Sequence, residues 1–468
     1  MEVTSHSSEL VTGLWAELTG RPGNVPLPRA QLVVSGPSGQ LPSDLPVEEA
    51  AVACVAVALL AAAALRDEYH RASTVRVDRA QAAVAVRSER YFQLDGRPAA
   101  AGFAPLSRFW PTADGWLRSH ANYPWHKAAL LEALGSSDDP DEVGRAIRSL
   151  PGAVVEQRVF AAGGVAAAVR EATEWGTHPQ GSAVAGEALI GHEVCGDASP
   201  RRRGAPGDLP VQGLRVLDLT RVIAGPVCTR FLGALGADVL RIDPPGHPDM
   251  RRGGVADTLL GKRSAAVDLG DAGATGVLHR LLDGADAVVC GYRAGSLDRF
   301  GLAPDELAAR HPALVVVYLD AWGHTGPWAE RRGFDSVVQA ATGIAARESQ
   351  DGLTPGALPC QLLDHGTGYL AAASVLDGLR RQAAGGGTVI RRLSLARTAL
   401  WLLDATESGI PQHTSAAGPS DATPWLVEFQ DEARVQAVGP PGWLDDRALS
   451  WPGPPAHYVA DQPVWAER

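Results

Sequence analysis

The chain has 468 residues, of which 45% are hydrophobic and 20% charged, with a formal net charge of −11. This balance is typical of an ordinary globular protein, and the acidic excess argues against a general nucleic-acid or anionic-membrane binder. The five cysteines are scattered without a CxxC pair, which disfavours a disulfide framework or zinc site and favours a reducing cytoplasm. The longest apolar run, residues 50–65, is short for a membrane span and predicts a buried helix.

The first 200 residues predict helices mixed with short strands and turns. Residues 1–45 contain several prolines and glycines with little periodicity, so we expect a loosely held lead-in. Residues 75–103 predict a helix and a short hairpin. Helical periodicity favours further helices at 46–70, 125–134, 140–149 and 163–175. Residues 46–199 are therefore expected to form a smaller α+β domain.

A linker is predicted at residues 200–210, which carry three consecutive arginines and an internal proline. Beyond it, strand-like apolar runs alternate with helical segments. The expected strands are 214–219, 237–243, 264–269, 285–292 and 313–319, and the expected helices are 224–235 and 272–282. This alternation predicts an α/β fold with a doubly wound parallel, Rossmann-like sheet in residues 211–402. Residues 403–468 predict a proline-rich linker and tail.

The ends of the expected strands indicate where a ligand would bind. In open parallel sheets, ligands bind beyond the carboxyl ends of the strands. Thr220, Asp243, Gly291 and Ala321 fall near those ends. We therefore expect the functional site at this edge of the sheet.

Asp364 is the strongest candidate for a catalytic side chain. It follows an apolar approach and precedes His365, Gly366, Thr367 and Gly368. A desolvated carboxylate can act as a nucleophile, and glycine lets backbone amides approach a ligand closely. The structural alternative is that Asp364 is the N-cap of a helix running to about residue 381.

Six motifs between residues 210 and 400 resemble, in order, those of the class III CoA-transferases. This is the CaiB/BaiF family, which includes formyl-CoA transferase, carnitine CoA-transferase and the 2-methylacyl-CoA racemases. For example, GKRSAAVDL at 261–269 resembles the family's NKRS..LDL, and AWGHTGPW at 321–328 resembles GFGQTGP. The other motifs are 213–243, 288–302, 333–343 and 358–368.

The resemblance implies an acyl-CoA:carboxylate CoA-transferase in which Asp364 attacks the thioester and forms a covalent intermediate. The amides of Gly366–Gly368 are candidates for stabilising the oxyanion, with Thr367 and His365 as auxiliaries. The coenzyme A thioester and a carboxylic acid are then substrates, and we expect no metal, tightly bound cofactor, nucleic acid or membrane. By alignment, the CoA-binding residues are Thr220, Arg221, Val222, Ile223, Lys262, Arg263, Tyr292, Arg293, Arg299, Phe300, Arg332 and Phe334.

Several positions depart from the family pattern. The racemase branch has Gly-His-Asp where this chain has Gly333-Phe334-Asp335, and phenylalanine cannot move a proton. We therefore place transferase above racemase, with His365 and His324 as possible substitutes for the missing base. A non-catalytic CoA-binding relative is the third alternative. Ile223 and Gly291 replace a glutamine and an asparagine found in some transferases.

The order of segments also departs from the family. Residues 114–117, 125–135 and 163–175 resemble the small domain and closing segments of family members, yet precede the segment at Gly213. The chain is then either permuted or the remnant of two trimmed and fused copies. A weak similarity between TVRV at 74–77 and TVIR at 388–391 accords with duplication. The resemblance further implies an interlocked homodimer.

Overall fold

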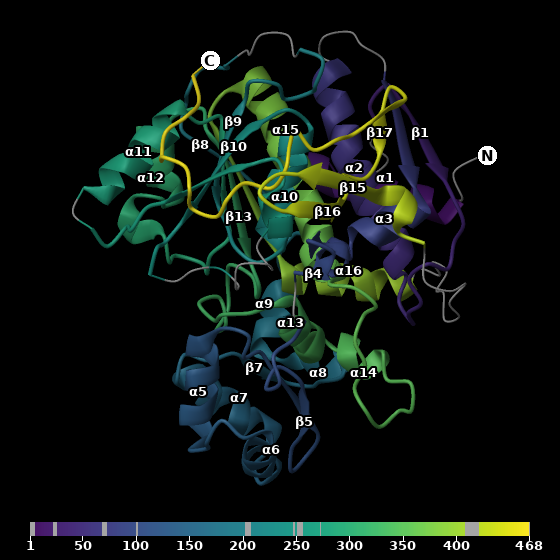
Figure 1. Cartoon of the computed structure of the whole chain (residues 1–468), viewed down its shortest axis with the longest axis vertical. Coiled ribbons are helices and arrows are strands. Elements are labelled where there is room, and N and C mark those ends of the chain that lie inside the picture. The colour runs from purple at the N-terminus through teal and green to yellow at the C-terminus, as the bar shows by residue number, and fades with distance from the viewer. Residues whose placement is uncertain are drawn as a thin grey trace.

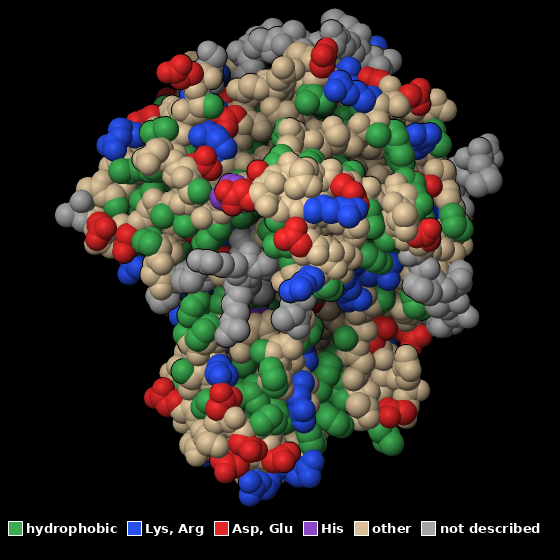
Figure 2. Space-filling view, in the orientation of Figure 1, with side chains coloured by type: hydrophobic (Ala, Val, Ile, Leu, Met, Phe, Trp, Pro, Cys, Tyr) green, Lys and Arg blue, Asp and Glu red, His purple; other side chains and the backbone are tan. Residues whose placement is uncertain are grey.

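A computed structural model describes residues 5–21, 26–67, 73–99, 102–201, 207–246, 249, 256–271, 273–407 and 421–467. A seven-stranded sheet occupies the centre of the molecule, and a smaller lobe of helices and short strands extends below it (Figure 1). On the face drawn in Figure 2, basic, acidic and apolar side chains are interspersed.

The central sheet has the strand order β11-β10-β9-β12-β13-β14-β8. All neighbouring pairs are parallel except β14 with β8, which is antiparallel. The strands are β8 (Gly191–Cys195), β9 (Arg215–Leu219), β10 (Asp238–Asp243), β11 (Arg263–Ala266), β12 (Ala287–Cys290), β13 (Val315–Asp320) and β14 (Thr388–Ser394). From β9 to β14 this is the doubly wound order, which confirms the predicted parallel sheet.

Helices cover both faces of this sheet. Alternate strand residues enter two separate cores, so that Val216 packs with α10 and α15, whereas Leu217 packs with α11 and α12. The helices of this half are α10 (Ala224–Ala234), α11 (Ala274–Gly284), α12 (Pro304–Arg310), α13 (Asp335–Thr342), α14 (Ile344–Arg347), α15 (Leu362–Gly385) and α16 (Leu395–Glu407), with the 3-10 turns η1 (Ala256–Leu259) and η2 (Asp298–Phe300).

The prediction of a loosely held lead-in at residues 1–45 is wrong, because the described part of this segment is ordered. It contains helix α1 (Ser5–Thr19) and strand β1 (Ala30–Ser35), which pairs with β2 (Ser73–Asp78). Leu14 and Leu18 of α1 are fully buried against α2 (Val47–Asp67). Helix α2 is apolar and long enough to cross a membrane, but 94% of its apolar window is buried inside the protein, as expected for a core helix.

The lower lobe contains the segments predicted as a smaller α+β domain. The helices at 125–134 and 140–149 are confirmed, but residues 163–175 form a strand and a separate helix. The lobe elements are β5 (Phe109–Pro111), β6 (Trp116–Ser119), α5 (Pro124–Leu134), α6 (Pro140–Arg148), α7 (Gly152–Ala161), β7 (Ala166–Ala168), α8 (Ala172–Thr177) and α9 (Pro179–Ala185). The hairpin within 75–103 follows α3 (Arg79–Ala85) and α4 (Ser88–Tyr91), as β3 (Gln93–Leu94) and β4 (Arg97–Pro98).

The tail is not merely a linker. Its described part adds η3 (Thr423–Trp425) and the strands β15 (Leu426–Gln430), β16 (Arg434–Val438), β17 (Trp443–Leu444) and β18 (Arg447–Ala448). Strand β16 pairs with β3 and β17 pairs with β2, so the chain end completes sheets begun near its start. Residues 202–206 of the predicted linker at 200–210 lie outside the described residues.

Two parts of the chain share one arrangement of elements. In each, a long buried helix leads into the second strand of a parallel pair, α2 into β2 and α15 into β14, and a further helix follows, α3 or α16. In the second part, α13 and α14 precede α15. The same number of residues separates Val47 from Ser73 as separates Leu362 from Thr388. Helices α2 and α15 pack against each other. This arrangement favours the fused-copies alternative, whereas the permuted segment order stays a prediction.

Candidate functional site

A cavity of about 850 Å³ lies at the carboxyl ends of the central strands. Leu219, Asp243, Gly291 and Ala321, at or just beyond the ends of β9, β10, β12 and β13, line it. The lower lobe contributes Tyr123, Trp125, His126, Ala162 and Gly163 to the lining. The cavity therefore occupies the edge of the sheet that strand direction predicted.

Asp364 lines this cavity from the first turn of α15. Its position corrects the N-cap alternative, because Gln361 occupies the N-cap position and the helix continues to Gly385. The residue is 4% exposed. Burial and the charges of Asp335 and Glu89 raise the pKa of Asp364 well above its ordinary value.

Asp335 supports the helix end that carries Asp364. Its Oδ2 atom accepts the backbone N–H of Asp364 at 3.1 Å, and Gln339 donates to its other oxygen. Gln339 in turn accepts the amide of Leu358 at 3.0 Å, which fixes the approach to α15. Burial is the main reason that the pKa of Asp335 is raised to about 6.

Glu89 approaches the same helix end from α4. Its Oε2 atom lies 3.1 Å from Nε2 of His365. Burial alone would raise the pKa of Glu89, but the hydrogen bond and charge of His365 outweigh burial and lower it. Nothing in the local sequence around Glu89 indicated this role, since the contact spans hundreds of residues.

Cationic side chains gather in the cavity. Arg221, Arg293, Arg299 and Arg332 line it as predicted, and Arg331 joins them. Arg293 and Arg332 are held by main-chain oxygens, those of Glu330 and Gly163. Four further predicted residues also line the cavity: Val222, Tyr292, Phe300 and Phe334.

Val222 has an unusual backbone conformation at the cavity wall. Its φ is 69°, in the left-handed region that β-branched residues rarely adopt. Its amide donates to Asp249 at 3.1 Å, which holds the turn between β9 and α10 in place. Ile223, the next residue, is buried in the apolar core and does not line the cavity.

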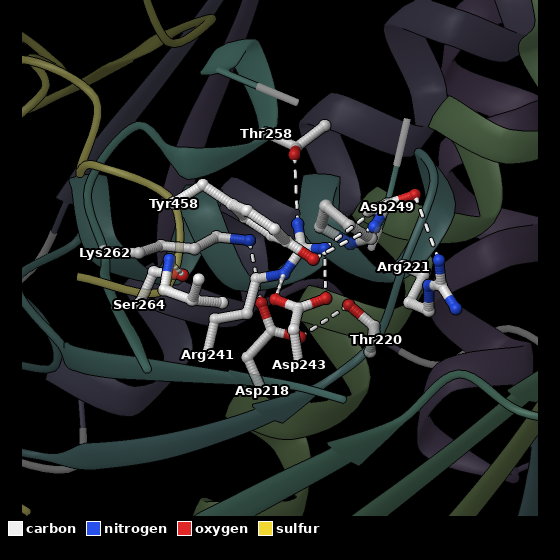
Figure 3. A network of polar contacts seen from close by, with 12 residues as sticks. Asp218, Thr220, Arg221, Arg241, Asp243, Asp249, Thr258, Lys262, Ser264 and Tyr458 are labelled. Atoms are coloured by element: carbon white, nitrogen blue, oxygen red, sulfur yellow. Dashed lines mark hydrogen bonds and ion pairs between the residues drawn. The ribbon is translucent and has the colours of Figure 1, made fainter. Parts of the chain in front are cut away.

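A buried charge network beside the cavity contains two residues that were predicted to bind CoA. Lys262 donates to Asp218 at 2.8 Å, and Thr220 also donates to Asp218 (Figure 3). Lys262 immediately precedes β11 and Arg263 begins it, so both stand at the amino end of that strand. Arg263 pairs with Asp238 at 3.0 Å. Neither cation is among the residues that line the cavity, which argues against the predicted contact with CoA.

Arg241 is the centre of that network. It donates to both oxygens of Asp243, at 2.7 and 2.8 Å, and to Asp249 at 2.7 Å (Figure 3). Asp249 also accepts a hydrogen bond from Tyr123 of the lower lobe, at 2.6 Å. The network thereby connects the end of β10 to the lobe across the cavity wall.

Aromatic rings cover Phe334. The imidazole of His120 stacks on it with centroids 3.7 Å apart, and His126 meets it edge-on at 5.6 Å. Burial lowers the pKa of His120 to about 3 and that of His126 to about 4, so both rings are neutral at pH 7. The predicted substitute bases, His324 and His365, do not line the cavity.

The glycines after Asp364 serve helix packing. Gly366, Thr367 and Gly368 lie in the second turn of α15, where backbone amides bond within the helix. A Cβ at Gly368 would lie 2.5 Å from the carbonyl oxygen of Ala224 in α10. None of the three residues is among those that line the cavity, which argues against the predicted oxyanion role.

Comparison with known proteins adds independent information. Residues 211–420 match the model of CoA-transferase family III. A probable fatty acyl-CoA transferase of Mycobacterium tuberculosis is 34% identical over 205 residues, which cover 41% of this chain and 52% of that protein. The human succinyl-CoA:glutarate CoA-transferase is 32% identical over 184 residues, 36% of this chain and 41% of the relative.

A crystal structure of the M. tuberculosis protein is 32% identical and covers 43% of this chain and 57% of its own, with a TM-score of 0.40. The chain spans about half the length of the curated relatives that it matches.

Proposed function

We propose that the chain transfers coenzyme A from an acyl-CoA to a carboxylic acid, because residues 211–420 match the model of CoA-transferase family III. The observation that carries the proposal is the position of Asp364, a buried carboxyl group in a cavity that also contains several arginines. Relatives named for transfer from succinyl-CoA to malate, citramalate or glutarate support a carboxylate acceptor.

The proposed reaction begins at the ionised form of Asp364, which the raised pKa makes scarcer but more nucleophilic. One oxygen attacks the thioester carbonyl carbon, the new C–O bond forms, and the C–S bond breaks with its electron pair on sulfur. The CoA thiolate then attacks the aspartyl carbonyl, which releases the first acid and leaves an aspartyl thioester. The acceptor carboxylate attacks this thioester, and the freed thiolate collects the new acyl group, which regenerates Asp364.

Burial supports the reactivity of this carboxylate. A carboxylate with little water around it and other carboxylates nearby is a high-energy ground state. Acylation converts it into a neutral anhydride, which removes the repulsion from Asp335. Because this repulsion is weaker in the transition state than in the reactant, its relief lowers the activation barrier.

The arginines support binding of the nucleotide part of CoA. Arg221, Arg293, Arg299 and Arg332 place positive charge along one cavity, and phosphate oxygens accept strong hydrogen bonds from guanidinium groups. The cavity volume of about 850 Å³ falls in the range of cofactor sites.

The test is capture of the covalent intermediate. After incubation with acyl-CoA and hydroxylamine, mass spectrometry should find a hydroxamate at Asp364. An Asp364→Asn variant should lose both the modification and CoA transfer, whereas Asp351→Asn, on an exposed turn, should retain both. Full transfer activity in Asp364→Ala would remove the proposed mechanism.

The racemase alternative gains no support at this site. Racemisation needs an acid and a base on opposite faces of the α-carbon, and Phe334 occupies the position of the family histidine. His126, the histidine of the lobe that lines the cavity, has a pKa lowered to about 4.

We also propose the cytoplasm as the compartment and an interlocked homodimer as the assembly, which the family resemblance implies. The free thiols of the cysteines accord with a reducing compartment. Helix α2 repeats the position of α15 within one chain, so a monomer is the competing outcome. Sedimentation equilibrium at micromolar concentration distinguishes the two.

A further inference from the structure

Glu89 reaches the site from a distant part of the sequence. It lies on α4, immediately after the elements β1, α2, β2 and α3 that repeat the arrangement around α15. Its carboxylate contacts the imidazole of His365 at 3.1 Å, where the His365 side chain is 1% exposed and that of Glu89 is 20% exposed. Since His365 follows Asp364 directly, Glu89 contacts the helix turn that carries the nucleophile.

Asp335 holds this turn from another element. It begins α13 and accepts the amide of Asp364 at 3.1 Å, together with the amide of Leu363. The first turn of α15 is therefore fixed by two carboxylates that α15 does not supply. Asp335 acts on the backbone, and Glu89 acts through the side chain of His365.

We propose that Glu89 is a positioning residue for Asp364, holding His365 against the first turn of α15 and placing a second negative charge beside the nucleophile. This inference rests on the proposed function, in which Asp364 is the group that becomes acylated. It assigns a catalytic purpose to the N-terminal part of the chain, which lies outside the matched family segment.

The charge of Glu89 acts on the free carboxylate more than on the acylated residue. Together with burial and Asp335, it raises the pKa of Asp364. When Asp364 forms an anhydride or thioester, its charge disappears and so does the repulsion. Glu89 therefore destabilises the ionised reactant more than the intermediate, which raises the nucleophilicity of the carboxylate while lowering the fraction that is ionised.

Other ionisable groups adjoin this cluster and contribute to its titration. Arg118 on β6 carries a charge that acts on Asp335, and Arg90 acts on Glu89. The ionisable groups around Asp364 and Glu89 are Asp335 from α13, Arg118 from β6, Arg87 and Arg90 around α4, Cys360 before α15, and His365 on α15.

The experiment follows the titration of Asp364 directly, without substrate. Protein labelled with carbon-13 at aspartate carboxyls gives one resonance that disappears in Asp364→Asn. Glu89→Gln keeps an acceptor for His365 but removes the charge, so we expect the Asp364 titration to move down by about one pH unit. Glu89→Asp keeps the charge, so the titration should remain close to that of the unmodified protein.

Glu428→Gln is the matched control, because Glu428 pairs with Arg434 on the exposed hairpin of β15 and β16. An unchanged Asp364 titration in Glu89→Gln overturns the inference, even if activity falls. In a transfer assay, kcat should fall in Glu89→Gln with little change in KM, because Glu89 does not line the cavity. A shifted titration in a protein without transferase activity would reject the proposed function but keep the assignment of Glu89.

Discussion

The hydroxyl of Tyr123 donates to the carboxylate of Asp249 at 2.6 Å, and this contact joins the lower lobe to the segment after β10. Tyr123 lines the cavity, and Asp249 also accepts hydrogen bonds from Arg241 and the amide of Val222. One carboxylate thus couples the lobe, the sheet edge and the turn between β9 and α10. The shape of the cavity depends on this connection.

Tyr123→Phe removes the donor from a buried carboxylate. We expect the free energy of unfolding to fall by about 1–3 kcal/mol, measured by urea denaturation, because the acceptor loses a partner. CoA affinity, measured by calorimetry, should also fall. Tyr318→Phe loses one hydroxyl hydrogen bond, to the carbonyl of Leu302, but its residue does not line the cavity. The Tyr318→Phe variant should lose stability and retain CoA affinity. If Tyr318→Phe and Tyr123→Phe lose the same amount of CoA affinity, this result argues against a role for Tyr123 in shaping the site.

Arg299→Gln tests the cationic wall. A charged hydrogen bond to phosphate contributes about 1.5–3 kcal/mol, so we expect CoA to bind at least tenfold more weakly. Arg263→Gln should bind CoA normally, because Arg263 pairs with Asp238 at the opposite end of its strand. Isothermal titration at two salt concentrations measures the CoA affinity of both variants. The affinity of Arg299→Gln should depend less on salt than that of the unmodified protein.

Lys262→Met tests whether this lysine is structural. Its side chain and that of Asp218 are both 0% exposed, so the substitution leaves a buried unpaired carboxylate. We expect a loss of about 3–5 kcal/mol in the free energy of unfolding. Lys127→Met is the matched control, because Lys127 pairs with Asp138 while 40% exposed, and it should cost no more than about 1 kcal/mol. If Lys262→Met has normal stability but no longer binds CoA, the predicted role of Lys262 in CoA binding would be restored.

The raised pKa of Asp335 predicts that the stability of the protein depends on pH. Its folded pKa, about 6, lies above the ordinary 3.8, so the folded state binds more protons between these values. Stability from this group is therefore fully present below pH 3.8 and is lost as the pH rises through 6. The loss is on the order of 3 kcal/mol, since the pKa shifts by about two units and each unit corresponds to about 1.4 kcal/mol. Urea unfolding at several pH values should show a steeper decline in the unmodified protein than in Asp335→Asn; parallel curves would contradict the assigned pKa.

Local sequence was sufficient for the sheet and for part of the site. Alternating apolar runs and helices predicted the parallel strands, because periodicity and chain direction are properties of short segments. Strand ends predicted the cavity edge, and the motif around Asp364 predicted the carboxyl group that lines it. The irregular start was wrongly predicted because α1 and β1 are stabilised by contacts with α2 and β2 rather than by their own composition.

The amino-acid sequence by itself determined the succession of strands and helices along the chain. It also determined which arginines follow the strand ends and where the family motifs lie, since each of these features depends on neighbouring residues. Only the tertiary structure decided that Glu89 meets His365, that Lys262 turns to Asp218, and that Gly368 admits α10. These contacts join residues far apart in the chain. Burial at such contacts also sets the protonation of Asp364, because desolvation depends on what the rest of the fold places around a carboxyl group.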